Sequence, residues 1–353
     1  MIKQKSPQPD VYPLKRFFNT AGDAIDAFLF GNPEVTANTP HVRDYMNLKR
    51  YMILVIMAVA PSALASIYFF GWRALLVIIF SYLFGVTTEW IFATVRREEM
   101  TEGAFVTCLI YPLILPPTVP LWVVAVGIVF GTVFGKEVFG GTGKNLFNPA
   151  LVGRIFVAVA FPSIMSGQWY KPISGAFGGF TAFSVDGLTT ATPLTNFKSD
   201  STIASYWELF TGNIAGCLGE TSKVLIILGG LFLMVTKVSN WRTPVSYLGT
   251  VALLSSILSQ ISSDRFAPPL FQLLSGGLMF GAMFMATDPV TSPMTLQGKW
   301  ICGSLMGVLT IVIRGLSGYS EGVMFAIILM NIFNPLIDNA VLSMITLKNK
   351  RSA

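Results

Sequence analysis

The run Gly103-Ala-Phe-Val-Thr-Cys-Leu-Ile-Tyr-Pro-Leu-Ile-Leu-Pro-Pro117 is apolar along most of its length and ends in two prolines. A regular helix needs about 20 residues to cross the ~30 Å hydrocarbon layer of a bilayer, and this run is shorter. Broken helices at membrane depth occur only where protein or a cavity surrounds them. The run therefore predicts an interrupted helix inside a membrane protein.

A second run repeats this design later in the chain. Gly277-Leu-Met-Phe-Gly-Ala-Met-Phe-Met-Ala-Thr-Asp-Pro289 also has a glycine, an apolar stretch and a closing proline. The tripeptide Phe-Asn-Pro follows in each half, at residues 147–149 and 333–335. The matching order predicts two related halves, although glycine and proline also recur by chance in apolar helices.

The apolar segments number about ten, five in each half. Because five is odd, the second half must cross the bilayer in the opposite sense to the first. We predict an all-α polytopic membrane protein built as two inverted five-segment repeats with broken helices. The segments are 51–70, 74–94, 103–115, 119–139 and 148–165, then 223–236, 245–262, 270–287, 300–313 and 322–345.

Composition favours the same class. Charged residues make up 12% of the 353 residues and hydrophobic residues 53%, with a mean hydropathy of +0.63. A soluble domain carries about 25% charged residues, which cover its surface. Helices that face lipid need no such cover.

The basic residues predict the orientation. Of the 24 lysines and arginines, Arg154 lies within a segment and six lie between segments on one side of the membrane. The remaining 17 lie on the side that holds both termini, which is therefore cytoplasmic. The pI near 9.2 thus reflects membrane topology and not nucleic-acid binding. The six are Arg73, Lys171, Lys198, Lys223, Arg265 and Arg314.

These assignments divide the chain into five parts. Residues 1–50 form a cytoplasmic segment with an amphipathic helix, which we expect on the membrane surface or on a partner subunit. Residues 51–165 and 223–348 are the two membrane repeats. Residues 166–222 form an extracytoplasmic loop, and residues 349–353 a cytoplasmic tail.

Cysteine and histidine usage limits the redox chemistry. The three cysteines form no C-x-x-C pair, and His41 is the only histidine. A disulfide framework, a bis-histidine haem and an iron–sulfur cluster held by this chain alone are therefore not expected. If the chain carries electrons, it needs an organic cofactor or a cluster shared with another chain.

The stretch Gly135-Lys-Glu-Val-Phe-Gly-Gly-Thr-Gly-Lys-Asn-Leu-Phe-Asn-Pro149 is glycine-rich and can bring backbone close to a ligand. It is not a P-loop, because Val138 and Asn145 replace the required glycine and Ser/Thr. The next helix begins beside Asn148, with Arg154 nearby, and its N-terminus can hold a polar or anionic ring system. A tight turn between packed helices is the alternative.

Acidic residues in or beside the apolar segments are candidates for an ion or proton path, because carboxylates are costly inside a membrane. For Glu89 and Glu102, near the predicted cytoplasmic edge, snorkelling to the interface is the alternative. The threonine-rich stretch 186–194 is by itself typical of a solvated loop. The five acidic residues are Glu89, Glu102, Glu220, Asp288 and Asp338.

Several blocks in this order give the sequence a family resemblance over nearly its whole length. They are His41-Val-Arg-Asp-Tyr-Met-Asn-Leu-Lys-Arg50, residues 135–145 with Asn148-Pro-Ala, Gly219-Glu-Thr-Ser222, Trp241-Arg242, Phe284-Met-Ala-Thr-Asp-Pro289 and Pro335-Leu-Ile-Asp338. The chain resembles the family that comprises the B subunit of the sodium-translocating NADH:quinone oxidoreductase and the D subunit of the Rnf complex. The long polar N-terminus favours the first branch. The chain is shorter than typical members of that branch, so Rnf remains the alternative.

The resemblance implies a covalent flavin. Family members carry FMN, esterified through its phosphate to the last threonine of a D-G-x-S-G-A-T pattern. That threonine is Thr192 here, with Asp186, Gly187 and Ala191 in register. The two residues before Ala191 are threonines instead of the usual serine and glycine. The predicted outer location agrees with attachment by an extracytoplasmic flavin transferase.

Members of the NADH:quinone branch also hold a non-covalent riboflavin. The resemblance places it near Asn148 and the glycine-rich stretch, with Gly141, Lys144 and Arg154 as further contacts. The flavins would do the redox chemistry, and the protein would set their position and electronics.

The implied function is that of a flavin-carrying subunit in the bacterial inner membrane. It would pass electrons through FMN and riboflavin towards quinone, only together with other membrane and peripheral subunits. A carboxylate such as Asp338 or Glu102 would bind Na⁺, because a hard cation prefers oxygen ligands. Two other interpretations stay open: a non-redox solute transporter or channel, and an assembly subunit with a vestigial site.

Overall fold

The computed structural model is helical, which confirms the predicted all-α class. Among the residues described, no strand forms, and one antiparallel bridge joins Trp169 to Thr190. The chain divides into two units, residues 1–54 and 55–353, with the boundary inside its first described helix, and all later elements belong to the second unit. The predicted amphipathic helix, Asp186 and Gly187 lie outside the described residues. The structure describes residues 48–98, 100–167, 169–173, 177–184 and 189–352.

All ten predicted segments are helical. The first half contains α2 (Leu48–Phe70), α3 (Trp72–Arg96), α4 (Gly103–Leu113), α5 (Leu121–Gly135), η1 (Glu137–Phe139), α6 (Pro149–Ala160) and α7 (Pro162–Ser166). The polar stretch that follows contains η2 (Gly178–Thr181), α8 (Pro193–Asp200) and α9 (Tyr206–Thr211). The second half contains α10 (Lys223–Val235), α11 (Arg242–Ile261), α12 (Pro269–Leu274), α13 (Leu278–Phe280), η3 (Gly281–Met285), α14 (Leu296–Leu316) and α15 (Val323–Ser352).

Within the described residues, six helices are long and apolar enough to cross a membrane. They are α2, α3, α5 with η1, α11, α14 and α15. The apolar helices α4, α6 and α10 are shorter, and the predicted segment 270–287 is divided among α12, α13 and η3. The predicted interruptions of the third segment in each half are therefore present.

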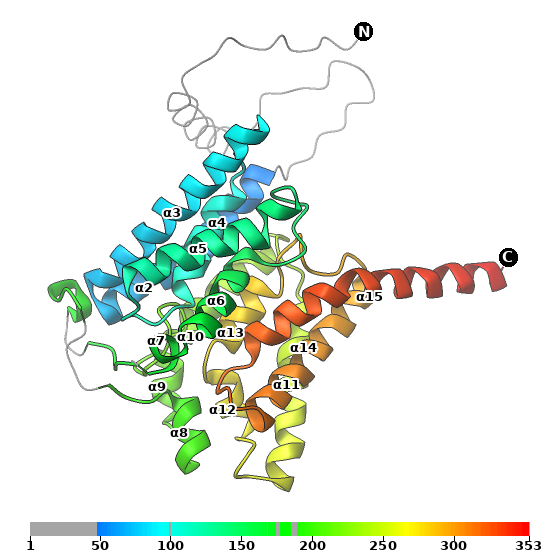
Figure 1. The fold of residues 1–353 in the computed structure, drawn as a ribbon. Coiled ribbons are helices and arrows are strands. Elements are labelled where there is room, and N and C mark those ends of the chain that lie inside the picture. Colours follow the sequence, from blue (N-terminus) through cyan, green and yellow to red (C-terminus); the bar gives the residue numbers. More distant parts are fainter. Residues whose placement is uncertain (1–47, 99, 168, 174–176, 185–188, 353) are drawn as a thin grey trace. The chain divides into compact units, whose positions relative to one another are not determined.

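Helices at matching positions in the two halves have the same neighbours. In the first half, α5 packs against α3 and α6, and α4 packs against α3. In the second half, α14 packs against α11 and α15, and α12 packs against α11. Figure 1 shows α3, α4 and α5 side by side, and α11 beside α14. The shared arrangement supports the predicted repeat.

The start of α6 is held close to α5 by small residues. A Cβ added at Gly131 would lie 2.4 Å from the carbonyl oxygen of Pro149, which no real side chain tolerates. A Cβ at Gly153 would lie 2.5 Å from the carbonyl oxygen of Gly127. The two backbones therefore touch, and the residues at the start of α6 are fixed in place.

The last helix extends further than the sequence predicts. It continues to Ser352, through the predicted cytoplasmic tail, and Pro335 lies inside it. A proline inside a helix removes one backbone hydrogen bond and clashes with the preceding turn, yet the helix continues past it here. Residues 342–348 are exposed, and this part of α15 runs beyond its neighbouring helices (Figure 1).

Candidate functional site

Thr192 is the residue immediately before α8 and caps that helix. Its Oγ1 accepts a hydrogen bond from the Thr195 backbone N–H at 3.3 Å and lies 2.9 Å from Thr195 Oγ1. Pro193 takes the first helical position, where its missing N–H costs nothing. Pro193 and Leu194 are buried, whereas Thr192 is half-buried and Ala191 is exposed. The hydrogen bond from the Thr195 N–H thus holds the Thr192 hydroxyl in place, and the half-buried side chain remains partly accessible.

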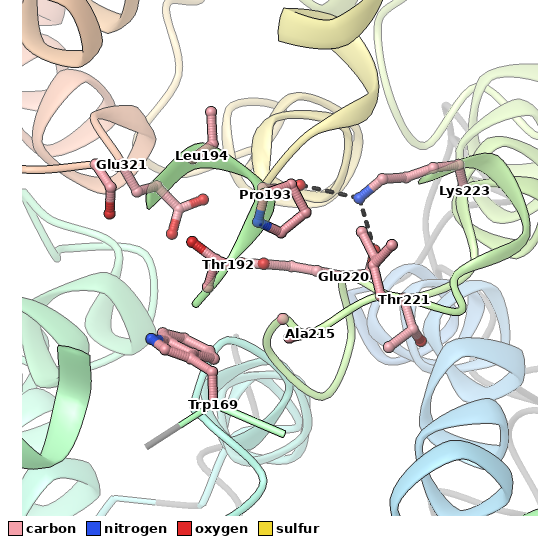
Figure 2. Close-up of a pocket in the computed structure, with 13 residues that line it drawn as sticks. Trp169, Thr192, Pro193, Leu194, Ala215, Glu220, Thr221, Lys223 and Glu321 are labelled. Atoms are coloured by element: carbon pink, nitrogen blue, oxygen red, sulfur yellow. Dashed lines mark hydrogen bonds between the residues drawn. The ribbon is translucent and has the colours of Figure 1, made fainter. Parts of the chain in front are cut away.

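A pocket opens beside Thr192. About 440 Å³ of space, open solvent at its mouth included, lies between the lining residues. Figure 2 shows Thr192, Trp169, Glu220 and Glu321 around this space. Trp169 is brought there by the bridge to the threonine stretch, in which the Thr190 N–H donates to the Trp169 carbonyl at 2.7 Å.

One wall of the pocket is the loop between α9 and α10. The Leu218 N–H donates to the Leu115 carbonyl at 3.1 Å, and the Gly219 N–H to the Leu113 carbonyl at 2.6 Å. These carbonyls are free because α4 ends there, and buried backbone groups need partners. The broken helix of the first half thus holds the loop that carries Glu220.

Two buried cations satisfy the carbonyls freed at the break between α12 and α13. Lys223, fully buried at the start of α10, donates to the carbonyls of Glu220 at 2.6 Å and Gly276 at 2.9 Å. Arg314 of α14 donates to the Gln272 carbonyl at 2.8 Å and the Ser275 carbonyl at 3.1 Å. The pocket is therefore built where the broken third segments of both halves meet.

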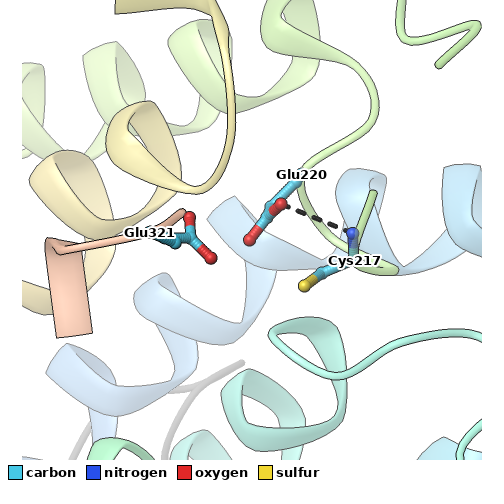
Figure 3. A group of neighbouring side chains, drawn as sticks. All are labelled: Cys217, Glu220 and Glu321. Carbon is cyan, nitrogen blue, oxygen red and sulfur yellow. Dashed lines mark hydrogen bonds between the residues drawn. The ribbon is translucent and has the colours of Figure 1, made fainter. Parts of the chain in front are cut away.

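Three potential ligand groups for a cation lie together beside the pocket. The side chains of Cys217, Glu220 and Glu321 are neighbours (Figure 3) and place one ligand atom each within 4.8 Å of one another. However, Arg154 Nη2 pairs with Glu321 Oε2 at 3.1 Å. The guanidinium already supplies positive charge to this group, which argues against a bound metal ion there.

The glycine-rich stretch forms a compact turn before α6. Gly140, Gly141 and Gly143 all have positive φ, at +111°, +92° and +88°. Asn148 caps α6, because its Oδ1 accepts from the Ala150 N–H at 3.1 Å and the Leu151 N–H at 3.4 Å. Lys144 is exposed beside this turn.

Arg154 does not face this turn. It lies six residues beyond Asn148, about 9 Å further along α6, and its partner is Glu321 at the pocket of Thr192. The structure therefore pairs Arg154 with Glu321, a residue with which the sequence did not group it.

The two carboxylates predicted for sodium lie on different elements and in different settings. Glu102 is buried and precedes α4. Asp338 lies on α15 and accepts hydrogen bonds from the Met294 N–H at 2.7 Å, the Thr295 N–H at 3.0 Å and Thr295 Oγ1 at 2.5 Å. Asp338 thus stabilises the start of α14. Glu89, the other acidic residue predicted near the cytoplasmic edge, is buried and forms an ion pair with Lys136 at 2.6 Å.

Sequence reasoning missed most of the charged residues at the pocket of Thr192. Glu220 stood out as an acidic residue beside an apolar segment, but Lys223, Arg314 and Glu321 did not. Lys223 and Arg314 look like ordinary flanking charges of membrane segments. The signal available was the polar block Gly219–Ser222, which directly precedes Lys223.

Known proteins match this sequence along nearly the whole chain. A family model described as the NQR2, RnfD, RnfE family matches residues 35–345. The chain is 38% identical to the B subunit of the Na(+)-translocating NADH-quinone reductase of Pseudomonas paraeruginosa and 39% identical to the protein of that name from Ectopseudomonas mendocina. Both alignments cover 90% of this chain and 90% of the relative. The same-named protein of Chromohalobacter salexigens is 36% identical over 90% of this chain and 87% of its own length.

Proposed function

Because the chain belongs to the NQR2, RnfD, RnfE family, we propose that it is the flavin-carrying membrane subunit of a sodium-translocating NADH:quinone oxidoreductase. The relatives named above are all B subunits of that enzyme, which favours this branch over Rnf and over a non-redox transporter. Such a subunit acts with others, so membrane and peripheral subunits of the same complex, Na⁺ and quinone are its proposed partners. Its proposed location is the bacterial inner membrane, with both termini cytoplasmic.

The proposed cofactor is FMN, joined to Thr192 Oγ1 through its phosphate by an extracytoplasmic flavin transferase. The observation that carries this proposal is the position of Thr192, a helix-capping threonine with an accessible hydroxyl at the edge of a pocket. An ester there would hold the phosphate at the N-terminus of α8, where the helix dipole favours an anion.

The residues around the pocket fit such a group. Trp169 offers an aromatic wall, and Lys223 places positive charge at the pocket wall. Ser275 Oγ, next to the pocket-lining Gly276, is buried and has no partner among the described residues. When bound, FMN would supply electron transfer, and the chain would bind it, orient it and exclude water.

A non-covalent riboflavin is proposed at Asn148 and the turn that contains Gly141 and Lys144. The three glycines of positive φ leave backbone without side chains there, which suits close approach of a ring. Arg154 is not part of this proposed site, because it pairs with Glu321. Asp338 and Glu102 remain proposed members of a sodium path.

In-gel fluorescence tests the FMN assignment. The full chain is produced with the flavin transferase and separated on a denaturing gel, where only covalently attached flavin remains. The wild-type band should fluoresce, and Thr192→Ala should abolish the signal. Thr195→Ala is the matched control, since it removes the neighbouring hydroxyl and leaves the acceptor in place. A fluorescent Thr192→Ala band, or a dark wild-type band, would refute the assignment.

A further inference from the structure

Five charged side chains converge at the pocket of Thr192 from different parts of the chain. Four of them are more than nine-tenths buried, and Lys223 has no exposed surface at all. Glu220, Lys223 and Glu321 line the pocket (Figure 2), and the other two lie behind it. The five are Arg154 of α6, Glu220 of the loop before α10, Lys223 of α10, Arg314 of α14 and Glu321 of the loop before α15.

The charges of this cluster do not balance. Arg154 pairs with Glu321, and the Glu220 carboxylate accepts from the Cys217 N–H at 3.4 Å. Lys223 and Arg314 donate to neutral oxygens, and neither forms an ion pair within the described residues. The charged groups that act on Lys223 are Glu220, Glu321 and Arg314. Three cations therefore face two carboxylates, and one positive charge is left over.

An uncompensated charge is costly in a buried, low-dielectric place. Three of the five side chains line the pocket itself. The excess charge is therefore best balanced by a negative charge that arises inside the pocket. A cofactor that gains electrons there would supply it.

We propose that Lys223 tunes the flavin in this pocket, by stabilising its reduced form over its oxidised form, and that Glu220 opposes this effect. The inference rests on the proposed function, which puts FMN on Thr192. Two electrons from NADH, delivered through other subunits, and one proton leave the isoalloxazine ring with one negative charge. A cation at the pocket wall lowers the free energy of that state, and charge close to the ring is a general way to set flavin potentials.

The test measures the midpoint potential of the covalent flavin. Wild-type, Lys223→Met and Glu220→Gln chains are produced at full length with the transferase and titrated spectroelectrochemically. The signal that is absent from Thr192→Ala defines the covalent flavin. We expect Lys223→Met to lower the reduction equilibrium constant at least tenfold, which is about 30 mV for a two-electron couple. Glu220→Gln should shift the potential upward.

Lys237→Met is the matched control. It removes the same charge from the other end of α10, about 20 Å away, and should leave the potential unchanged. Opposite shifts of the midpoint potential in Lys223→Met and Glu220→Gln establish the inference. General damage to the pocket would not shift the potential in opposite directions according to the charge removed. If Lys223→Met does not fold, Glu220→Gln alone tests the inference. An upward shift of its potential supports the inference, and an unchanged or lower potential contradicts it. A fluorescent chain whose potential stays fixed, or moves the same way in both variants, overturns this inference but not the FMN assignment. A wild-type chain without flavin overturns the assignment itself.

Discussion

Arg154 Nη2 and Glu321 Oε2 lie 3.1 Å apart, although 167 residues separate them along the chain. Arg154 belongs to α6, the last segment of the first half, and Glu321 precedes α15, the last segment of the second. The other carboxylate oxygen of Glu321 accepts from the Gly277 N–H at 2.5 Å, at the break before α13. One ion pair thus links both halves to the broken helix at the pocket.

This link should contribute strongly to stability. Removing one partner of a buried ion pair leaves an unpaired charge and costs about 3–5 kcal/mol. Arg154→Met should therefore lower the unfolding temperature of the full chain in detergent markedly. Since Arg154 is more buried than Glu321, Glu321→Gln leaves the more buried charge unpaired, and we expect it to cost at least as much. The double variant should lose less than the two single losses together, and strictly additive losses would contradict the coupling.

The contact between α5 and α6 predicts a second effect on stability. Gly131→Ala forces a Cβ to within 2.4 Å of the Pro149 carbonyl oxygen, and overpacking of this kind costs about 1–3 kcal/mol. Gly249→Ala, in α11, meets nothing within 4 Å and should be neutral or slightly stabilising. Unfolding temperatures of the two variants in the same detergent check this pair. Equal unfolding temperatures of the two variants would show that α5 and α6 make room for the added methyl group at no cost.

The substitution Asp338→Asn has two expected effects, one on stability and one on Na⁺ transport, which can be measured separately. Asp338→Asn keeps one acceptor oxygen and loses the charge at the start of α14, so we expect a loss of about 1–2 kcal/mol. If Asp338 also lies on the sodium path, Na⁺ transport by the reconstituted complex should fall sharply at equal amounts of folded complex. The exposed Asp264→Asn is the control. Unchanged transport would remove Asp338 from the path and leave only its structural role.

The sequence was sufficient to predict the segments, because hydrophobic runs and prolines act locally. The run that begins at Gly103 is too short to span, and α4 does end at Leu113. Thr192 was singled out through a family pattern that is itself local. The sequence does not show which residues of different segments come together. Arg154 follows Asn148 closely in sequence, yet its partner is Glu321.

The charged cluster shows why such groupings cannot be predicted from the sequence. Lys223 and Arg314 flank apolar segments, as many basic residues of membrane proteins do. Their role depends on carbonyls left free at the break between α12 and α13, and on how that break meets α10 and α14. Neither local propensity nor hydrophobic periodicity contains that information.

The central claim is that the hydroxyl of Thr192 holds a flavin at this pocket. Peptide mass spectrometry of the native chain, produced with its transferase, tests it most directly. The peptide containing Thr192 should be heavier by the mass of FMN less one water, with the modification on that residue. An unmodified peptide, or FMN on a different residue, would contradict it.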